Sequence, residues 1–554
     1  MAFIRRVRTP SGATGVQIAE YVGDRRQRIV RYVGSARTPA ELGVVMAQAR
    51  HLLAEYERPG QDVLDLGLDL VPEVGLIGPG DEDGMLDVPA VAPAFPVAPV
   101  LAGPGRVVAT ASRLLFDVLA GVYDQLGFGA VGDEVFRDLV VARVAEPTSL
   151  ADVGRVLTDL GREPAPYITM RRTLERCHAG AYQDRLAELC FAYAQVSGDI
   201  SLVLYDVTTL YFEAEKEDGL RKVGFSKERR VDPQIVVGLL VDRAGFPLEI
   251  ACFEGNKAEK HTIVPVIEAF KARHQIENMV VVADAGMLSA TNLTMLDEAG
   301  HRFIVGSRVT KAPIDLESHF RWHGDAFSDG QVIDTLTPKA GKNAQNDTAI
   351  KLEPVWDPET HTSSWRAVWA YSAKRAARDN KTLTAQENRA LAVIEGQSAA
   401  RKPRFVKAAT SGFTLDEAAL TRARRLVGLK GYVTNIPAHL MPAPEVIASY
   451  HDLWNVEASF RMSKTDLAAR PLFARRRDAI EAHLTIVFTA LAVSRTIQHR
   501  TGLALRRVLR TLRPLRSATI AINGAAQTFP PHLDADQRAL VTAILGGDVT
   551  HQGK

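Results

Sequence analysis

Three acidic residues of the sequence lie at positions where carboxylates often bind catalytic metal ions, at the ends of strands and on a helix. Asp206 ends an apolar run that begins at Ile200, Asp284 ends a second such run, and Glu457 follows in a segment with helical spacing. Carboxylate oxygens are the ligands that Mg²⁺ prefers, and two such ions about 4 Å apart promote phosphodiester transfer. One ion activates the attacking hydroxyl and the other stabilises the leaving oxygen. An aspartate at a strand end is more often a turn residue, so the inference depends on all three acids together.

The segment around Glu457 adds groups that suit a phosphate. Five of its residues recur at steps of three and four: Tyr450, Trp454, Glu457, Arg461 and Lys464. At 3.6 residues per turn, their side chains share one face of a helix. An acid flanked by two cations and an aromatic ring fits a metal ligand beside phosphate-contacting groups. The plainer interpretation is a surface ion pair between Glu457 and Arg461.

The elements around Asp206 and Asp284 follow the pattern of a mixed α/β fold. Apolar runs predict five strands, and helical spacing predicts a helix in each interval between the last three strands. The expected strands are 200–206, 234–242, 247–253, 279–284 and 302–306, and the expected helices are 262–273 and 290–299. This order predicts an α/β, ribonuclease-H-like catalytic core in which Asp206 and Asp284 end neighbouring strands.

The whole sequence divides into segments of different composition and periodicity. From the N-terminus, we expect a basic β segment plus helix (1–60), an acidic proline-rich linker (61–106), a helical DNA-binding domain (107–198), the catalytic core (199–307 and 436–500) with a mainly β insertion (308–435), and a basic C-terminal tail (501–554). An insertion is expected because 172 residues separate Asp284 from Glu457, far more than a crossover helix needs.

The formal net charge of +2 conceals an uneven distribution. Residues 1–37 contain eight arginines and two acids, whereas residues 61–105 contain eight acids and no lysine or arginine. Residues 461–520 contain thirteen lysines and arginines and three acids. Two basic segments indicate a polyanionic partner, although a solvated helix face explains any single cluster equally well.

Other features of the sequence exclude several classes of protein. A composition of 46% hydrophobic and 24% charged residues is typical of a globular chain and excludes wholesale disorder. The cysteines Cys177, Cys190 and Cys252 have no CxxC spacing, which argues against a disulfide scaffold or zinc finger. The N-terminal residues lack the apolar core of a signal peptide, and the apolar stretch 482–494 is too short to cross a membrane. We therefore expect a cytoplasmic protein.

Several motifs together resemble one family. The spacing Tyr450-x2-Leu453-x3-Glu457-x6-Lys464 matches the signature Tyr-x2-Arg-x3-Glu-x6-Lys at three of its four positions. Further motifs are Leu204-Tyr-Asp-Val-Thr-Thr-Leu-Tyr-Phe-Glu, Gly224-Phe-Ser-Lys, Phe253-Glu-Gly-Asn-Lys-Ala-Glu-Lys-His-Thr, Val281-Val-Ala-Asp-Ala-Gly-Met and Gly431-Tyr-Val-Thr-Asn. On these motifs, the sequence resembles the DDE transposases of bacterial insertion sequences, specifically the IS-four superfamily. The resemblance spans residues 200–495.

The resemblance implies a catalytic reaction and a set of ligands. Asp206, Asp284 and Glu457 would be the metal-binding triad for Mg²⁺, with Mn²⁺ as a substitute, in DNA cleavage and strand transfer. Tyr450 and Lys464 would contact the phosphate near the cleaved end. The partners would be the terminal inverted repeats of an insertion sequence and its target DNA, and the synaptic complex would contain a dimer. No membrane partner is expected.

The sequence departs from the family signature at one position and leaves other roles open. Leu453 replaces the signature arginine, and Arg461 is our candidate for its phosphate contact. Asn256 and Glu259 would position water or DNA near the metals, or would simply cap a helix. In relatives, a tryptophan of the insertion stacks on a flipped base, although core packing is the plainer role. The candidates here are Trp322, Trp356, Trp365 and Trp369.

Three other functions remain open at this point. Asp206-Val-Thr-Thr resembles the motif of haloacid-dehalogenase phosphatases, but these need a second aspartate where Thr208 stands. A non-catalytic DNA-binding protein derived from a transposase would explain the basic segments but not the three retained acids. A ribonuclease-H-like nuclease without strand transfer would share the core. The predicted end-binding segments before residue 199 favour transposition.

Overall fold

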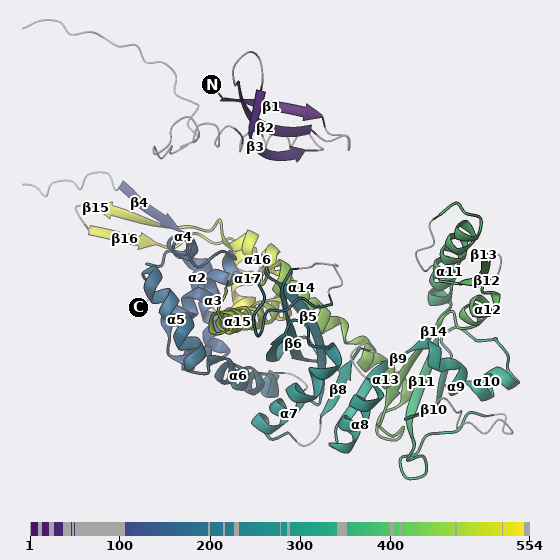
Figure 1. Cartoon of the computed structure of the whole chain (residues 1–554). Helices are drawn as coiled ribbons and strands as arrows, with labels where there is room; N and C mark the ends of the chain where they lie inside the picture. Colours follow the sequence, from purple (N-terminus) through teal and green to yellow (C-terminus); the bar gives the residue numbers. More distant parts are fainter. Residues whose placement is uncertain are drawn as a thin grey trace, which may run out of the picture. The chain divides into compact units, whose positions relative to one another are not determined.

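The chain, described by a computed structural model (Figure 1), forms two compact units, Met1–Ala98 and Pro99–Lys554. The structure describes residues 2–8, 14–21, 27–36, 46, 49, 106–197, 200–213, 216–225, 232–276, 279–284, 289–340, 352–398, 404–409, 412–470, 472, 474–522 and 525–547. Met46 and Ala49 are helical, and the rest of the helix predicted within residues 1–60 lies outside these residues, as does nearly all of the predicted linker.

The N-terminal unit contains a three-stranded antiparallel sheet, within the basic β segment predicted at 1–60. Its strands, in the order β1-β2-β3, are β1 (Ala2–Arg8), β2 (Thr14–Tyr21) and β3 (Gln27–Ala36). The side chains of Val16 and Ile18 are buried, whereas those of Arg5, Arg28 and Arg31 are exposed. The sheet therefore has an apolar interior and exposed arginines, because successive residues of a strand alternate between its faces.

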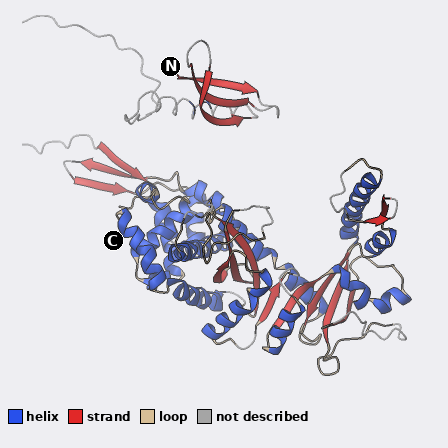
Figure 2. Ribbon diagram, viewed as in Figure 1, coloured by secondary structure: helices blue, strands red, loops and turns tan. Residues whose placement is uncertain are grey.

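The second unit contains a mixed sheet of eight strands (Figures 1 and 2) in the order β10-β11-β14-β9-β8-β5-β6-β7. The strands are β5 (Leu202–Tyr211), β6 (Gln234–Asp242), β7 (Pro247–Glu254), β8 (Val280–Ala283), β9 (Arg302–Ser307), β10 (Val332–Pro338), β11 (Ser364–Tyr371) and β14 (Leu429–Thr434). β5, β8 and β9 are parallel, and the other neighbouring pairs are antiparallel. All five strands predicted from the apolar runs are present.

The central strands have apolar sequences because both faces of the sheet are buried there. Every residue of β6 is buried, which accounts for its nearly continuous apolar sequence. The two predicted helices are also present, as α7 (Ile263–His274) and α8 (Ala290–Glu298). The Ser289 hydroxyl accepts a hydrogen bond from the Asn292 backbone N–H and so caps α8.

The segment 308–435 differs from the mainly β insertion predicted for it. Three of its strands, β10, β11 and β14, extend the core sheet beyond β9. Its helices are α9 (Ala312–Asp315), α10 (Glu317–Trp322), α11 (Ala373–Ile394) and α12 (Glu417–Arg425), and a hairpin is formed by β12 (Val406–Ala409) and β13 (Gly412–Leu415). The segment is therefore mixed α/β rather than mainly β. Its longest helix, α11, has a polar sequence with a narrow apolar stripe, including Leu383 and Ala390, which is enough to bury one side of the helix.

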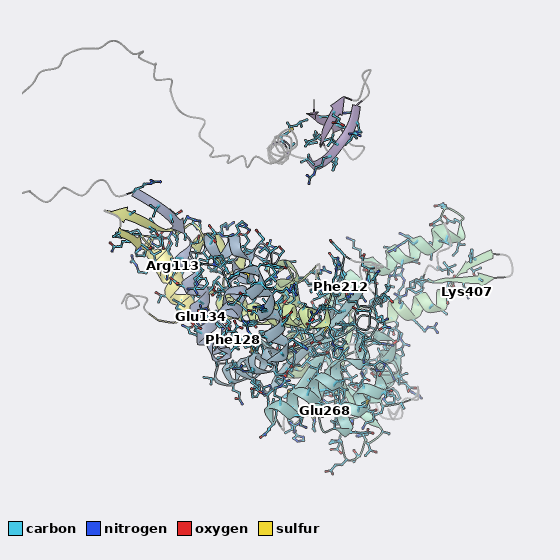
Figure 3. All side chains as sticks on the ribbon, turned by 60° about the vertical axis from the view of Figure 1, so that its left-hand side comes forward. Arg113, Phe128, Glu134, Phe212, Glu268 and Lys407 are labelled. Atoms are coloured by element: carbon cyan, nitrogen blue, oxygen red, sulfur yellow. The ribbon has the colours of Figure 1, made fainter. Side chains whose placement is uncertain are left out.

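This insertion has a small core of its own. Leu383 and Ala390 of α11 pack with Phe405 and with Leu420 of α12. Figure 1 shows α11, α12 and the β12–β13 hairpin grouped together, and Figure 3 marks the hairpin with Lys407. The N-terminus of α11 is joined to the sheet where the Ser372 N–H donates to the Gly428 carbonyl oxygen at 3.0 Å.

The predicted helical domain surrounds the longest helix of the described residues, α15 (Arg477–Thr501). Its own helices are α2 (Arg113–Gln125), η1 (Phe128–Val131), α3 (Glu134–Ala145), α4 (Val153–Asp159), α5 (Tyr167–Ala179) and α6 (Tyr182–Ser197). α15 packs against α2, α3, α5 and α6. By length and composition α15 would be able to cross a membrane, but 83% of its apolar window is buried within the protein, as expected of a core helix.

The ends of this unit meet in a second small sheet. Residues 106–111, predicted to begin a helical region, form β4 (Arg106–Ala111) instead. β4 pairs with β15 (Ser517–Ile522), which pairs with β16 (Ala525–Phe529). Sequence periodicity could not show this pairing, because the partner strand lies about 400 residues away. The predicted basic tail is thus folded and also contains α16 (Leu505–Leu512) and α17 (Ala535–Leu545).

Candidate active site

The register between β5 and β8 brings Asp206 and Asp284 side by side. Tyr205 of β5 pairs with Ala283 of β8 in a parallel arrangement, so the two acids follow at the same level. Neighbouring strands are about 4.8 Å apart, and residues at one level of a parallel pair face the same side. Asp206 is half-buried and Asp284 is exposed.

Asp206 does not end its strand, contrary to the sequence prediction. β5 continues for five residues to Tyr211, and Phe212 (labelled in Figure 3) forms a β-bridge with Leu472. The strand is longer than its apolar run because it remains paired with β6 after β8 has ended. The Oδ1 atom of Asp206 accepts a hydrogen bond from the Val207 backbone N–H at 2.8 Å.

Tyr450 connects a helix to this pair of acids. It lies near the end of α13 (Ala443–His451), which packs against β8, β9 and β14, and its buried hydroxyl donates to Oδ1 of Asp284 at 2.8 Å. Burial raises the pKa of Tyr450, and the adjacent Asp284 carboxylate raises this pKa further. The negative charge of Glu457 acts in the same direction, so Glu457 belongs to the same electrostatic environment. Tyr450 therefore stays a hydrogen-bond donor.

A buried arginine fixes the start of α13. The side chain of Arg366 on β11 is 1% exposed and donates to both carboxylate oxygens of Asp334, at 2.9 and 2.6 Å. Its remaining nitrogen, Nη1, donates to the carbonyl oxygens of Ile436 and Met441, at 3.0 and 2.7 Å. Because Met441 lies two residues before α13, the Arg366 side chain positions the helix that carries Tyr450.

The five residues of the predicted helix face lie on two helices. α13 ends at His451, and α14 (Trp454–Thr465) carries Trp454, Glu457, Arg461 and Lys464. The Leu453 N–H donates to the Tyr450 carbonyl oxygen, three residues back, which tightens the chain at the joint. Asp452 at the joint is held by Arg243 at 2.7 Å. The side chain of Leu453, which replaces the signature arginine, is buried.

The turn between β6 and β7 holds α14 in place. Asn455 Nδ2 donates to the Arg243 carbonyl oxygen at 2.9 Å. The Ser459 hydroxyl donates to the Gly245 carbonyl oxygen at 2.7 Å. Gly245 has a φ of +86°, and a side chain there would collide with the Arg495 guanidinium. These bonds orient α14 so that Glu457, in its first turn, is exposed.

The two cations predicted on α14 have different surroundings. Arg461 is exposed and lines a cavity of about 490 Å³ between α6, α14 and α15, together with Trp454. Lys464 is half-buried, with its Nζ atom 5.9 Å from the centroid of the Phe460 ring. No distance places either cation at the acids, so their phosphate contacts stay predictions.

Asn256 and Glu259 lie beyond β7. Asn256 is exposed in the turn, and Glu259 begins η2 (Glu259–His261), where its carbonyl oxygen accepts from the Thr262 hydroxyl at 2.7 Å. The preceding Gly255 is buried against the neighbouring strand and the 218–225 loop. The described contacts of Asn256 and Glu259 belong to this turn, and a role for either side chain beside the metals stays a prediction.

Lys430 is a member of the site that sequence reasoning missed. It lies on β14, directly before the Gly431-Tyr-Val-Thr-Asn motif, with its Nζ atom 4.9 Å from the centroid of the Tyr450 ring. Burial lowers the pKa of Lys430, Asp284 opposes this shift, and Arg375 adds to it. The only signal in the sequence was its place next to a recognised motif.

The four tryptophans of the insertion differ in how far their side chains are buried. Trp356, Trp365 and Trp369 are buried, and their Nε1 atoms donate at 3.1 Å to Ser364 O, Asp297 Oδ2 and Asp315 Oδ2, respectively. Trp322, at the end of α10, is 40% exposed. The three buried tryptophans pack the core, so Trp322 is the candidate that remains for stacking on a base.

The donor atoms of the three acids suit a hard divalent cation. Asp206 and Asp284 follow the paired residues of adjacent strands, and the charge of Glu457 contributes to the raised pKa of Tyr450. Among the residues that the structure describes, no three His, Cys, Asp or Glu side chains converge closely enough to hold a metal ion. Residues 285–288, which directly follow Asp284, are outside the described residues. Convergence of Glu457 on the aspartates therefore stays a prediction.

No curated protein matches this chain. One similar solved structure is the piggyBac transposase synaptic complex with hairpin DNA, at 8% identity, with a TM-score of 0.36 over 81% of this chain and 84% of that chain. Another is the Mos1 transposase paired-end complex with the left transposon end, at 10% identity, with a TM-score of 0.15 over 28% and 49%.

The match to a protein family rests on the sequence. The sequence model described as transposase DDE domain matches residues 197–493, more than half of the chain. This range contains β5, β8 and the helices α13 and α14. The chain therefore belongs to the transposase DDE domain family.

Proposed function

We propose that this protein is an insertion-sequence transposase that binds the ends of its element, cleaves a phosphodiester bond there and joins the freed 3′ hydroxyl to target DNA. The observation that carries the proposal is the parallel register of β5 and β8, in which Asp206 and Asp284 each follow the last paired residues, Tyr205 and Ala283. The Tyr450 hydroxyl donates to the Asp284 carboxylate. In the strand order β7-β6-β5-β8-β9, β6 is antiparallel to both of its neighbours, whereas β5, β8 and β9 are parallel to one another. This arrangement supports a ribonuclease-H-like core.

Asp206, Asp284 and Glu457 would hold Mg²⁺, or Mn²⁺ in its place. When bound, the metal supplies charge to activate the attacking hydroxyl and to stabilise the leaving oxygen. Tyr450 keeps the Asp284 carboxylate oriented through its hydrogen bond. Lys430, Lys464 and Arg461 are the cations of this region proposed to attract the phosphate.

Two basic surfaces support DNA as the partner. The N-terminal sheet exposes Arg5, Arg28 and Arg31. Helix α16 buries Leu505, Val508 and Leu512 and exposes the arginines on its opposite side, which are Arg506, Arg507 and Arg510. The guanidinium groups of these three arginines are suited to bind the phosphates of the DNA backbone. Such contacts supply the part of the DNA affinity that does not depend on base sequence. Two element ends in one complex would require at least a dimer.

The test uses a labelled duplex with the terminal inverted repeat found beside the gene, a supercoiled target plasmid and Mg²⁺. We expect the wild-type protein to cut the end and join it to the plasmid. Asp206→Asn, Asp284→Asn and Glu457→Gln should bind the duplex but lose cleavage by at least about a thousandfold, because each removes a metal ligand. Glu298→Gln, at an exposed end of α8, is the matched control and should cleave normally.

Each alternative gives a different result in this assay. Binding without cleavage by the wild-type protein would indicate a non-catalytic DNA-binding protein. Cleavage without joining would indicate a nuclease. Cleavage by all three variants at the wild-type rate would show that the triad assignment is wrong.

A further inference from the structure

The insertion brings the start of a helix to the edge of the sheet where the proposed metal ligands lie. β11 and β9 both run antiparallel to β14, so β11 is parallel to β9 and, through it, to β8 and β5. Parallel strands point toward the same edge of a sheet. Helix α11 begins two residues after the end of β11 (Figure 1), so its first turn is at the edge that carries Asp284.

The register of the strands relates β14 to Asp284. Ala283 of β8 is level with Val305 of β9, which is level with Val433 of β14. Asp284 follows Ala283, and Tyr432 adjoins Val433 in the same direction, because β14 runs opposite to β8. Only β9 separates these two strands, so the distance across the sheet is two strand spacings, about 10 Å. A side chain of β14 at this level is thus within the reach of one nucleotide from the acids.

The side chains of β14 at this edge face α13. The ring of Tyr432 is 5.0 Å from the ring of Tyr450, whose hydroxyl donates to Asp284. Lys430, two residues before Tyr432, lies on the same face of the strand, and its Nζ atom is 4.9 Å from the centroid of the Tyr450 ring. The Lys430 ammonium group therefore lies beside the same tyrosine that contacts Asp284.

The first turn of α11 is fixed against the start of β14. The Ser372 N–H donates to the Gly428 carbonyl oxygen at 3.0 Å, and the Gly428 N–H donates to Asp379 Oδ2 at 3.2 Å. A Cβ atom on Gly428 would come within 2.8 Å of the Ala376 Cβ atom, so the two segments are in close contact. Arg375 belongs to this turn, and these contacts hold it near Lys430, which follows Gly428 by two residues.

The charge of Arg375 acts on the groups beside the acids. Burial is the main cause of the lowered pKa of Lys430 and of the raised pKa of Tyr432, and Arg375 lowers the pKa of both. Arg375 and Lys430 are half-buried, and neither forms an ion pair with an acid of the residues that the structure describes. Two neighbouring cations repel each other, and an anion that binds to both relieves the repulsion.

We infer that Arg375 and Lys430 together bind a backbone phosphate of the element end, next to the phosphate that reacts at the acids. The guanidinium group suits paired hydrogen bonds to phosphate oxygens, and the ammonium group adds a point charge. The inference rests on the proposed function, because it assigns the cations to the DNA strand that would be cut. The insertion 308–435 then holds this strand through Arg375.

The test measures binding of a precleaved element end to the full-length protein in Mg²⁺ without target DNA, by fluorescence anisotropy. Each of several such ends carries one neutral methylphosphonate near its 3′ end. One of them should weaken wild-type binding about tenfold, as expected for one charge-assisted contact. Arg375→Gln should bind the unmodified end about tenfold more weakly and should lose nothing further with that methylphosphonate. Arg375→Lys, which keeps the charge, should recover part of the affinity.

Arg389→Gln is the matched control, since Arg389 is exposed on the same helix about 21 Å further along its axis. It should respond to every methylphosphonate as the wild type does. Equal sensitivity of wild type and Arg375→Gln to every methylphosphonate, in proteins with the same circular dichroism, would overturn the inference. Lys430→Gln should become insensitive at the same phosphate, and insensitivity at a different one would also overturn it. Failure of the wild-type protein to cut and join DNA would instead count against the proposed function.

Discussion

At the scale of residues, the site depends on hydrogen bonds that orient carboxylates. Asp284 is exposed, and the Tyr450 hydroxyl donates to one of its carboxylate oxygens at 2.8 Å. Tyr450 was predicted to contact phosphate. That contact stays a prediction, and the hydrogen bond to Asp284 leads us to propose a positioning role as well. A donor that acts on a metal ligand in this way typically changes metal affinity as well as rate.

Replacement of Tyr450 by phenylalanine tests this positioning role. Loss of a hydrogen bond to a charged group costs about 1.5–3 kcal/mol, which corresponds to a roughly ten- to hundredfold slower cleavage. We also expect a higher Mg²⁺ concentration for half-maximal activity, measured by titrating Mg²⁺ in the cleavage assay. Tyr432→Phe is the control, because the Tyr432 hydroxyl lies 3.3 Å from His451 rather than on an acid. Equal effects of the two substitutions would argue against the role.

A second residue-scale prediction concerns pH. Burial raises the pKa of Asp315 to about 7, although its hydrogen bonds with Thr337 and Trp369 oppose the shift. The folded protein therefore holds a proton that the unfolded chain releases above about pH 4. Stability contributed by this proton is present at low pH and is lost as the pH rises toward 7, by up to about 4 kcal/mol in total.

Asp315→Asn should remove this dependence. Thermal unfolding of the wild-type protein is expected at a lower temperature at pH 8 than at pH 5, and the difference should shrink in the variant. Glu359→Gln, which changes an exposed acid of the same region, should keep the wild-type difference. Parallel pH profiles for wild type and Asp315→Asn would contradict the prediction.

At the scale of elements, the motifs that begin at Gly224 and at Phe253 contact each other, and the close approach of their backbones requires glycine at both Gly224 and Gly255. Gly224 lies against Gly255, and a Cβ atom on Gly224 would come within 2.1 Å of the Gly255 carbonyl oxygen. Gln234, at the start of β6, donates from Nε2 to that same oxygen at 2.9 Å. The loop 218–225 and the turn after β7 are thus packed backbone to backbone, and this contact fixes the turn that carries Asn256 and Glu259.

Substitution of Gly224 by alanine should disturb this contact. The methyl group would force the two backbone segments apart, at a cost of about 1–3 kcal/mol. We expect a lower midpoint of urea unfolding, followed by circular dichroism. Gly219→Ala is the matched control in the same loop, because a Cβ there meets nothing within 4 Å. If the two variants unfold at the same urea concentration, the packing argument fails.

At the scale of the whole molecule, the chain separates into units that carry different parts of the proposed function. The sheet β1-β2-β3 lies in the unit Met1–Ala98, whereas the acids and the second basic surface lie in Pro99–Lys554. The second unit closes on itself through β4 and β15 and through the bond from the Ser112 hydroxyl to the Arg513 carbonyl oxygen at 2.8 Å. It therefore has the contacts expected of an independently stable unit.

A fragment of residues 99–554 should fold and should bind element-end DNA more weakly. We expect its far-UV circular dichroism to retain the helical signal and its unfolding to stay cooperative. Its affinity should fall with salt less steeply than that of the full chain, by about 0.9 in logarithmic slope for each DNA phosphate that the fragment no longer neutralises. Gel-shift titrations at several salt concentrations measure this slope. An unchanged slope would show that the N-terminal arginines do not bind DNA.

Local patterns in the sequence were enough to predict the elements of the core. The apolar runs that end near Asp206 and Asp284 form β5 and β8, because burial on both faces of a sheet selects continuous apolar residues. The helical spacing of the residues after Thr262 forms α7. The β segment predicted within residues 1–60 corresponds to the β1-β2-β3 sheet. Family motifs added the candidate functional positions, and membership of the transposase DDE domain family is confirmed.

What the sequence by itself determined was therefore the strands, the family and the three acids as candidates. Only the tertiary structure decided that Tyr450 bonds Asp284, that Lys430 lies over the Tyr450 ring, and that β4 pairs with β15. It also showed that the helix predicted around Glu457 is two helices, since Asp452 at the joint is held by Arg243 from a distant turn. Each of these contacts joins residues far apart in the chain. Periodicity reports the burial of a local segment, whereas long-range contacts depend on how the segments pack together.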